Sequence, residues 1–163
     1  MALYGSLKDV AMFTGIAHEI IDDVVTQQIG YYKVMLADST PNVYGESLTK
    51  SYIGPVLLNC LIVRGEYTTV SEDFGPDRKR AVSFSFLKGS LVQANVIPEI
   101  GDVIMYNELY YEADNLNENQ LVLGKDSNYA YSEGLEGFGN SFSITIDTHM
   151  TTPERLGIKQ FRL

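Results

Sequence analysis

The sequence has one cysteine and two histidines, which excludes several kinds of site. Cys60 has no partner in the chain for a disulfide. With only His18 and His149 beside it, the set is too small for a zinc site of the usual kind. Residues 57–62 around it are mostly apolar, so we expect a buried thiol rather than a nucleophile, which needs an exposed, electropositive setting. We therefore expect no metal site and no cofactor.

Positive charge is also scarce. The chain has 12 Lys and Arg against 21 Asp and Glu, a formal net charge of −9 at pH 7. General affinity for nucleic-acid phosphates needs concentrated Lys and Arg, so it is not expected here. Proximity to DNA is still allowed, because an acidic or neutral surface lets DNA pass without binding it.

Long apolar runs are missing. No stretch approaches the roughly 20 residues of a membrane-spanning helix. The first six residues lack the charged and then apolar segments of a signal peptide, so we expect no membrane contact. The 45% hydrophobic and 20% charged content of the 163 residues is typical of a folded domain. We expect one domain over residues 1–163, with an N-terminal arm (1–15) and a C-terminal tail (151–163).

Catalytic patterns are lacking too. The glycines of residues 134–139 do not lie between a strand and a helix, as a phosphate-binding loop requires. No serine lies in a nucleophile-elbow sequence. Neighbouring carboxylates such as Glu72 and Asp73 occur in any acidic protein and say little about acid–base chemistry. The sequence therefore predicts no enzyme and no catalytic residues.

One amphipathic helix is predicted over residues 16–28. Its apolar residues recur at helical spacing: Ile16, Ile20, Ile21, Val24 and Val25. Thr14 can cap its start and Gly30 can end it. Residues 1–14 before it are expected to form short mixed turns. We expect the helix to cover an open barrel end or a sheet face; the alternative is that it binds a partner.

Most of the remaining chain is typical of strands. Residues 56–63 are almost continuously apolar, as in a strand covered on both faces, and residues 81–88 and 142–147 alternate. Asn107-Glu108 predicts a tight hairpin turn within 101–114, and residues 115–120 predict a further turn. The fold class is mainly β: a small barrel or sandwich of roughly five to seven strands with one N-terminal helix and long loops.

A charged segment, residues 68–80, separates two of these strands. It is longer than the two to five residues of usual hairpin loops, so we expect a long surface loop. Long loops on a β scaffold often carry function. As a channel or gating loop it would use Glu72, Asp73, Phe74, Asp77, Arg78, Lys79 and Arg80. Its basic residues then pair with acidic groups of an adjacent subunit or approach phosphates; the alternative is a solvated charged loop.

Several short motifs, in their order along the chain, resemble the neck proteins of contractile-tailed bacteriophages, of the head-completion or head-closure type. The similarity extends from about residue 20 to about residue 158. The motifs are Tyr31-Tyr32-Lys33, Tyr44-Gly45-Glu46-Ser47, Asn59-Cys60-Leu61-Ile62, Arg64-Gly65, Asp73-Phe74-Gly75-Pro76-Asp77, Gly101-Asp102-Val103-Ile104, Tyr111-Glu112 and Asn117-Glu118-Asn119-Gln120.

The resemblance implies a structural virion protein, assembled in the host cytoplasm and located at the head–tail junction. Such a subunit forms a homo-oligomeric ring, expected to be a hexamer, with the portal or adaptor protein above it and the tail terminator or tail tube below. Double-stranded DNA passes through the ring's channel without sequence recognition. In similar proteins a loop between barrel strands helps to retain packaged DNA, and residues 68–80 match that loop by position and length. The family has no catalytic residues.

Long tyrosine-bearing loops suit an assembly interface. The candidate subunit or partner contacts are Tyr44, Glu46, Tyr129, Tyr131, Arg155 and Arg162. Two other functions stay open from the sequence: a stand-alone soluble β-barrel binding module, and another ring protein of the connector or tail, such as an adaptor or tail terminator.

Overall fold

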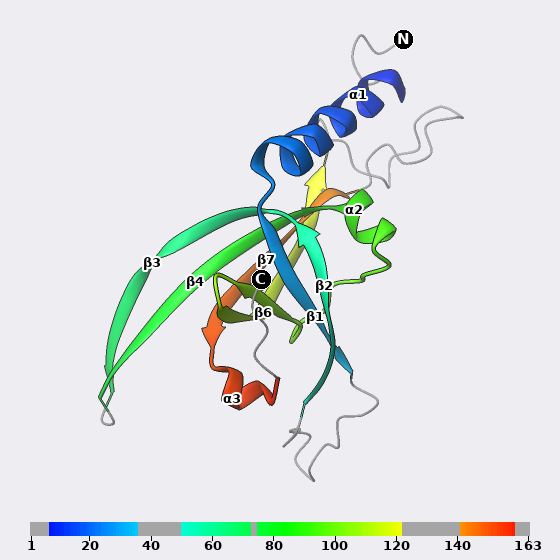
Figure 1. Cartoon of the computed structure of the whole chain (residues 1–163). Coiled ribbons are helices and arrows are strands. Elements are labelled where there is room, and N and C mark those ends of the chain that lie inside the picture. The colour runs from blue at the N-terminus through cyan, green and yellow to red at the C-terminus, as the bar shows by residue number, and fades with distance from the viewer. Residues whose placement is uncertain (1–6, 36–49, 73–74, 122–140, 159–163) are drawn as a thin grey trace.

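The computed structural model describes residues 7–35, 50–72, 75–121 and 141–158 (Figure 1). Two consecutive helical segments come first, α1 Leu7–His18 and the π-helical η1 Glu19–Val25. The strands are β1 Gln28–Met35, β2 Ser51–Asn59, β3 Leu61–Glu72, β4 Gly75–Leu87, β5 Val103–Tyr106, β6 Leu109–Leu121 and β7 Ser141–Thr151. Two short helices complete the described chain, α2 Lys88–Gln93 and α3 Pro153–Leu156.

All seven strands form one antiparallel sheet in the order β2-β1-β5-β6-β7-β4-β3. The mainly β class is confirmed, but the sheet is open rather than a closed barrel. Its two edge strands follow each other in the chain, with only Cys60 between Asn59 of β2 and Leu61 of β3. Because consecutive Cα atoms are 3.8 Å apart, the two edges approach to within about 8 Å at this end. The sheet is therefore strongly curled.

The larger of two buried clusters lies on the concave side of this curled sheet. Val82, Phe84 and Phe86 alternate along β4 and are buried, as the sequence predicts. Pairing places Phe84 beside Ile146 of β7, on the same face of the sheet. The ring of Tyr111 from β6 packs edge-on against Phe84 at 5.7 Å between centroids. Alternation along β4 thus directs its apolar side chains to the concave face. All four residues of β5 are buried instead, because a second buried cluster adds to the core: Tyr32, Val103, Met105, Tyr110 and Leu156.

The predicted hairpin at Asn107-Glu108 is confirmed. The two turn residues have φ of 52° and 62°, the left-handed values of a tight type I′ connection between β5 and β6. The turn expected at residues 115–120 is wrong, because β6 continues to Leu121. Its pairing with β7 shifts register at three places from Ala113 onward. These shifts are β-bulges, and they accommodate polar residues in an exposed part of the strand.

The single strand expected at residues 56–63 is also wrong. The apolar run is divided at Cys60 into the ends of β2 and β3, which are opposite edges of the sheet. Leu57 is 47% exposed and Val63 is 64% exposed. Continuous apolarity predicts a strand covered on both faces, but an antiparallel sheet can leave one face open to solvent, and Leu57 and Val63 lie on that open face.

The predicted N-terminal helix exists, but its bounds are wrong. It begins at Leu7 instead of after Thr14, so residues 7–14 are helical rather than mixed turns. It ends at Val25, where Thr26 takes a left-handed conformation with φ 46°. Gly30 lies inside β1, not at a helix end; a Cβ there would meet Pro55 at 3.3 Å.

Most of the N-terminal helix does not cover the sheet. Figure 1 shows α1 extending away from the strands, and Ile21 of η1 is its buried residue among those described. Apolar side chains along the helix stay 39–73% exposed: Met12, Phe13, Ile16, Ile20, Val24 and Val25. The expectation of a helix packed over the barrel end therefore fails for α1 and holds only near Ile21.

Candidate functional site

Residues 68–80 form a projecting two-stranded arm, not the long loop expected from the sequence. The arm comprises residues 67–72 of β3 and residues 75–80 of β4, paired from Tyr67↔Arg80 to Glu72↔Gly75. The neighbouring strand β7 pairs with β4 only over residues 81–87, so within the described sheet each arm strand has the other as its sole partner. Figure 1 shows these ends of β3 and β4 running clear of the other strands.

Strand formation here is consistent with the residues once the pairing is known. Thr68 and Thr69, which suit strands, pair with Lys79 and Arg78. Pro76 pairs with Ser71 near the tip, where an edge strand tolerates a missing N–H. Charge does not prevent pairing in a ribbon open to solvent. The charged sequence therefore predicted a long loop where paired strands form; residues 73 and 74 of that segment lie outside the described residues.

The base of the arm is held by Arg80. Its Nε donates to the carbonyl of Gly65 at 3.2 Å, and its Nη1 donates to the Tyr67 hydroxyl at 3.1 Å. The guanidinium also lies 4.5 Å from the centroid of the Tyr67 ring, a cation–π distance. The β3–β4 register shifts between Arg64 and Tyr67, so Arg80 ties down a bulge. Arg80 is thereby committed to its own strand pair.

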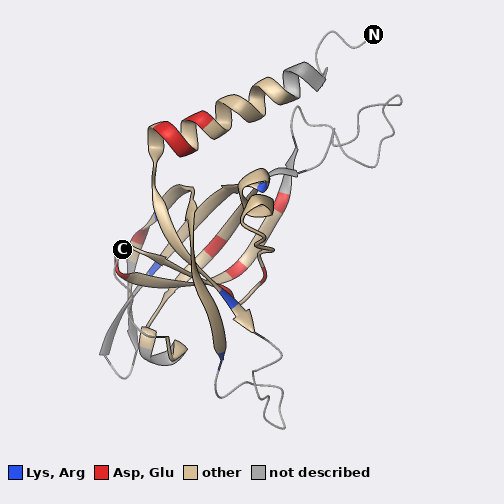
Figure 2. Cartoon of the chain, turned by 45° about the vertical axis from the view of Figure 1, so that its right-hand side comes forward, with Lys and Arg blue, Asp and Glu red and all other residues tan. Residues whose placement is uncertain are grey.

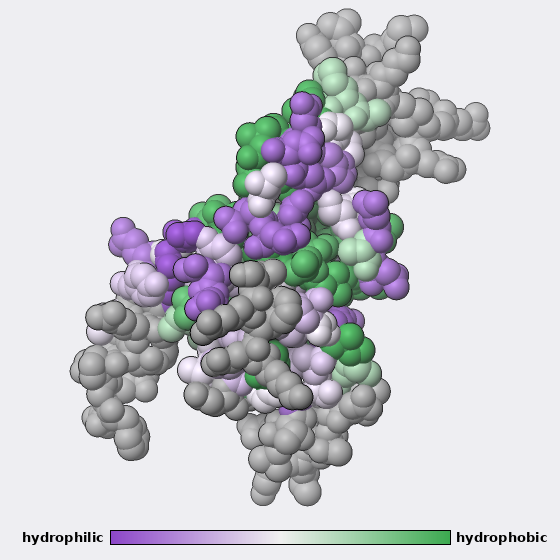
Figure 3. Space-filling model, viewed as in Figure 1, coloured by the Kyte–Doolittle hydropathy of each residue, from purple (hydrophilic) through white to green (hydrophobic). Residues whose placement is uncertain are grey.

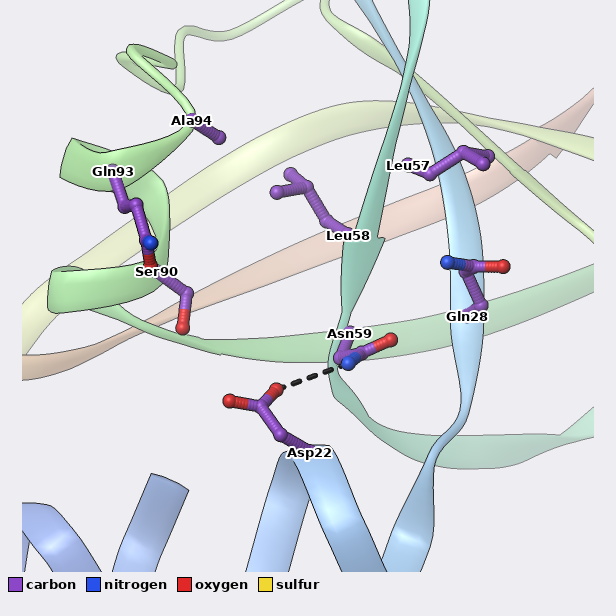
Figure 4. A pocket seen from close by; sticks show the side chains of 8 residues that line it. All are labelled: Asp22, Gln28, Leu57, Leu58, Asn59, Ser90, Gln93 and Ala94. Carbon is purple, nitrogen blue, oxygen red and sulfur yellow. Dashed lines mark hydrogen bonds between the residues drawn. The ribbon is translucent and has the colours of Figure 1, made fainter. Parts of the chain in front are cut away.

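A pocket of about 320 Å³ lies at the other end of β4, between η1, β2 and α2 (Figure 4). We call it the Asp22 pocket. Figure 4 shows the Asp22 carboxylate pointing from η1 toward Asn59, with α2 on one side and Leu57 and Gln28 on the other. Its lining combines apolar and hydrogen-bonding side chains: Asp22, Gln28, Leu57, Leu58, Asn59, Ser90, Gln93 and Ala94.

The carboxylate of Asp22 is held in its charged form. The Asn59 side-chain amide donates to Oδ1 at 3.0 Å, and Nδ1 of His18, one turn earlier, lies 3.3 Å from Oδ2. The Asn59 hydrogen bond is the largest influence on the pKa of Asp22 and holds it below the usual 3.8. The side chain remains 39% exposed. Figure 2 shows that acidic residues gather at this end of the helix, which includes Glu19.

An apolar groove lies between the N-terminal helix and the sheet. Its volume is about 410 Å³, and its lining includes Ile20, Leu61 and Phe86, with Ser85 and Thr145 at the sheet. Figure 3 shows apolar side chains continuing along one side of the helix. The chain thus exposes apolar surface on the N-terminal helix, on β3 at Val63, and on α2, where Val92 is 71% exposed.

The structure does not bring the sequence-predicted site residues together into one described cluster. Asp73, Phe74, Tyr44, Glu46, Tyr129, Tyr131 and Arg162 lie outside the described residues. The backbone places Glu72, Asp77, Arg78 and Lys79 in the arm strands and Arg155 in α3. Of the candidates, only Arg80 has a described side chain, at the arm's base.

Sequence reasoning missed the Asp22 pocket. Asp22 is on the polar side of the helical pattern, which predicts a solvated residue. Asn59 is 37 residues further along the chain and lies at the end of an apolar run. Nothing in either local pattern connects the two residues. The pocket arises because the end of β2 returns to the end of η1.

Cys60 is fully buried, as predicted, and burial raises the pKa of its thiol to about 12. Within the described ranges, no group of three or more His, Cys, Asp and Glu is placed to hold a metal ion. In the same part of the chain, no helix is long and apolar enough to span a membrane.

Comparison with known proteins gives a partial likeness to solved structures. No protein-family description and no curated protein sequence matches the chain. A chain in a solved structure described as "Virion of native gene transfer agent (GTA) particle" is similar to 77% of this chain and 94% of its own length. The two are 6% identical, with a TM-score of 0.49. That likeness is too low to bear on function.

Proposed function

We propose that this chain is a structural subunit of a phage particle, forming a ring in the neck between the head and the tail. The portal or adaptor protein lies above the ring, and the tail terminator or tail tube lies below. The ring encloses a channel that double-stranded DNA passes through without being read. The subunit is not an enzyme, needs no cofactor and makes no membrane contact.

The projecting arm is the observation that carries this proposal. An isolated two-stranded ribbon is only marginally stable in water, so an arm that leaves its sheet is best explained by a neighbour that receives it. The exposed apolar side of α1 adds a second surface suited to contact. These features support an assembly subunit over a stand-alone binding module, for which neither projection has a use. The motifs resembling phage neck proteins supply the kind of assembly.

Net charge fits the same role. A channel wall with excess carboxylates repels DNA phosphates at short range and keeps the DNA free to move. The ring, proposed to contain six copies, requires a head-to-tail contact between copies that closes on itself. An adaptor or tail-terminator ring is the nearest alternative. It differs from a neck ring in its position in the particle, whereas the acidic channel and the head-to-tail contact between copies would be the same.

Particles from cells that carry the gene test the proposal. Deleting the gene is expected to leave heads and tails unjoined, and supplying it in trans is expected to restore joined particles. Electron microscopy of wild-type particles is expected to show the protein as a ring at the head–tail junction. Absence of the protein from purified particles, or normal joining without the gene, contradicts the proposal.

A further inference from the structure

Two arginines lie on the concave side of the sheet at the base of the arm, Arg64 of β3 and Arg80 of β4. Arg64 pairs with the buried Val82, and Arg80 lies two residues before Val82 on the same strand. Because side chains alternate along a strand, both arginines share the face of Val82. Diagonal neighbours of this kind are roughly 7–8 Å apart. The chain, whose net charge is −9, thus holds a local pair of positive charges.

Tyrosine rings position both guanidinium groups. The guanidinium of Arg64 lies 5.0 Å from the centroid of the Tyr106 ring, and that of Arg80 lies 4.5 Å from the centroid of the Tyr67 ring. Tyr106 belongs to β5, which is not a neighbour of β3 in the sheet, so its contact with Arg64 crosses the concave side. Burial raises the pKa of Tyr111, and the positive charges of Arg80 and Arg64 oppose that rise. The two arginines therefore converge on one region.

The fold leaves N–H donors of both guanidinium groups available. Arg80 donates through Nε to the carbonyl of Gly65 and through Nη1 to the hydroxyl of Tyr67, which fixes the group in place. Within the described ranges its Nη2 has no acceptor, and the contact of Arg64 is with the face of an aromatic ring. In the same ranges, no Asp or Glu side chain forms an ion pair with either arginine. An anion from outside the chain can therefore take these donors.

We propose that Arg64 and Arg80 form a site for phosphate oxyanions and that the phosphates of the DNA backbone occupy it. The assignment to DNA rests on the proposed function, which brings DNA past the subunit. The planar fork of a guanidinium matches the oxygens of a phosphate and adds hydrogen bonds to the attraction of opposite charges. Contacts to phosphates carry no base information, which agrees with DNA that passes without being read.

A local pair of arginines is compatible with an acidic subunit. One or two phosphate contacts for each copy are weak and are weakened further by salt, and the excess of carboxylates repels DNA elsewhere. In a ring the same contact is repeated around the channel, so the contacts reinforce one another. The DNA is thereby held in place without being trapped. Of the two roles predicted for the basic residues of 68–80, the site assigns Arg80 to phosphates rather than to an adjacent subunit.

NMR of the purified subunit tests the site. Titration with a short DNA duplex at low salt is expected to shift the side-chain Nε–H signals of Arg64 and Arg80. Titration with inorganic phosphate alone distinguishes a free anion from the DNA backbone as the source of the phosphate. Signals that move with inorganic phosphate but not with the duplex keep the oxyanion site and overturn its assignment to DNA. Signals that move with neither probe overturn the site.

The affinity of the variant Arg64→Gln for the duplex gives a second readout. Fluorescence anisotropy is expected to show binding about tenfold weaker at low salt, with a salt dependence reduced by about one phosphate contact. Arg64 donates none of the hydrogen bonds that fix the base of the arm, so the variant is expected to keep its fold. Lys88→Gln removes an exposed positive charge in α2, beyond the other end of β4, and is the matched control. Equal losses in the two variants, or no loss in Arg64→Gln, overturn the site.

Particles separate this inference from the proposed function. With Arg64→Gln, heads and tails are expected to join normally but to lose packaged DNA faster than particles with Lys88→Gln. Joined particles with unaltered DNA retention overturn the holding of DNA at Arg64 and leave the neck ring standing. Particles that lack the protein overturn the neck ring, whereas binding of the duplex by the purified subunit is decided by the NMR titration alone.

Discussion

The hydroxyl of Tyr31 donates a 2.5 Å hydrogen bond to Oδ2 of Asp102, and both residues are fully buried. The same carboxylate accepts from the backbone N–H groups of Val34 and Glu99, each at 2.8 Å. Lys33 adds an ion pair at 3.1 Å. A buried carboxylate is costly unless its oxygens are fully paired, and here four donors from two segments surround it. This cluster fixes β1 against the turn that leads into β5.

Replacing Tyr31 with phenylalanine is expected to destabilise the protein by about 1.5–3 kcal/mol, the usual value for a hydrogen bond to a charged group. The change removes the hydroxyl, leaves the ring in the core and deprives a buried carboxylate of one donor. Urea unfolding followed by circular dichroism measures the difference. Tyr52→Phe makes the same chemical change where, among the described residues, the buried hydroxyl has no hydrogen-bond partner, so it is expected to be neutral or slightly stabilising. Equal losses in the two variants would show that the Asp102 contact contributes nothing of its own.

Replacing Gly65 and Gly15 with alanine is expected to change the stability of the protein in opposite directions. At Gly65, at the base of the arm, a Cβ would lie 2.7 Å from the carbonyl oxygen of Ala81, so the strands must separate. Gly65→Ala is expected to lower stability by about 1–3 kcal/mol, as overpacking does. At Gly15, in α1, a Cβ meets nothing within 4 Å, so Gly15→Ala is expected to stabilise the helix by up to about 1 kcal/mol. Thermal unfolding of the two variants measures whether each change lowers or raises stability. A Gly65→Ala protein as stable as the wild type, with unchanged NMR signals of the arm's amides, would contradict the close approach of Gly65 to the carbonyl of Ala81.

The pKa of Asp22 is expected to rise when Asn59 is replaced by alanine, because the hydrogen bond from Asn59 is the main cause of its lowered value. A lowered folded-state pKa means that ionised Asp22 adds stability above its ordinary pKa of 3.8, and this contribution is lost as the pH falls through the lower folded value. In Asn59→Ala this contribution is smaller, so the variant is expected to unfold more easily than the wild type above pH 3.8. In strong acid, where Asp22 is protonated in both proteins, this part of the difference in unfolding free energy disappears. Titration of the side-chain carboxyl by NMR measures the shift. Gln28→Ala, which changes the same pocket without removing a described hydrogen bond to Asp22, is expected to leave the titration unchanged.

The thiol of Cys60 is expected to resist alkylation in the folded protein at pH 8. It is fully buried and its pKa is raised to about 12, so accessible thiolate is nearly absent. Reaction with iodoacetamide should begin only as urea unfolds the chain, with the same midpoint as the loss of β structure. A native-state rate near that of a free cysteine would show that the chain around Cys60 opens readily and contradict its burial.

Local patterns predicted individual elements well where one face is buried and the other is exposed. The alternation of Val82, Phe84 and Phe86 correctly predicted which side chains of β4 enter the core. The Asn107-Glu108 pair correctly predicted a hairpin, because a tight turn needs left-handed residues and asparagine tolerates that conformation. Both are short-range effects, and neither depends on the rest of the fold.

Patterns failed where pairing over longer distances decides the outcome. Residues 68–80 have the charge and the Gly-Pro pair of a loop, yet each strand of the arm is satisfied by the other. The apolar run around Cys60 supplies two strands instead of one because its halves belong to opposite sheet edges. The helix extends earlier than its clearest apolar periodicity, and its exposed apolar side shows that periodicity alone does not say what a helix packs against.

The sequence by itself determined a mainly β chain with one N-terminal helix, a buried cysteine and an acidic balance, because each depends on composition or on spacing within a few residues. Only the tertiary structure decided that the sheet stays open, that residues 68–80 form an arm, and that Asp22 and Asn59 meet at the far end of β4. Those features depend on which strand pairs with which, and a two-residue alternation contains no information about the identity of the partner.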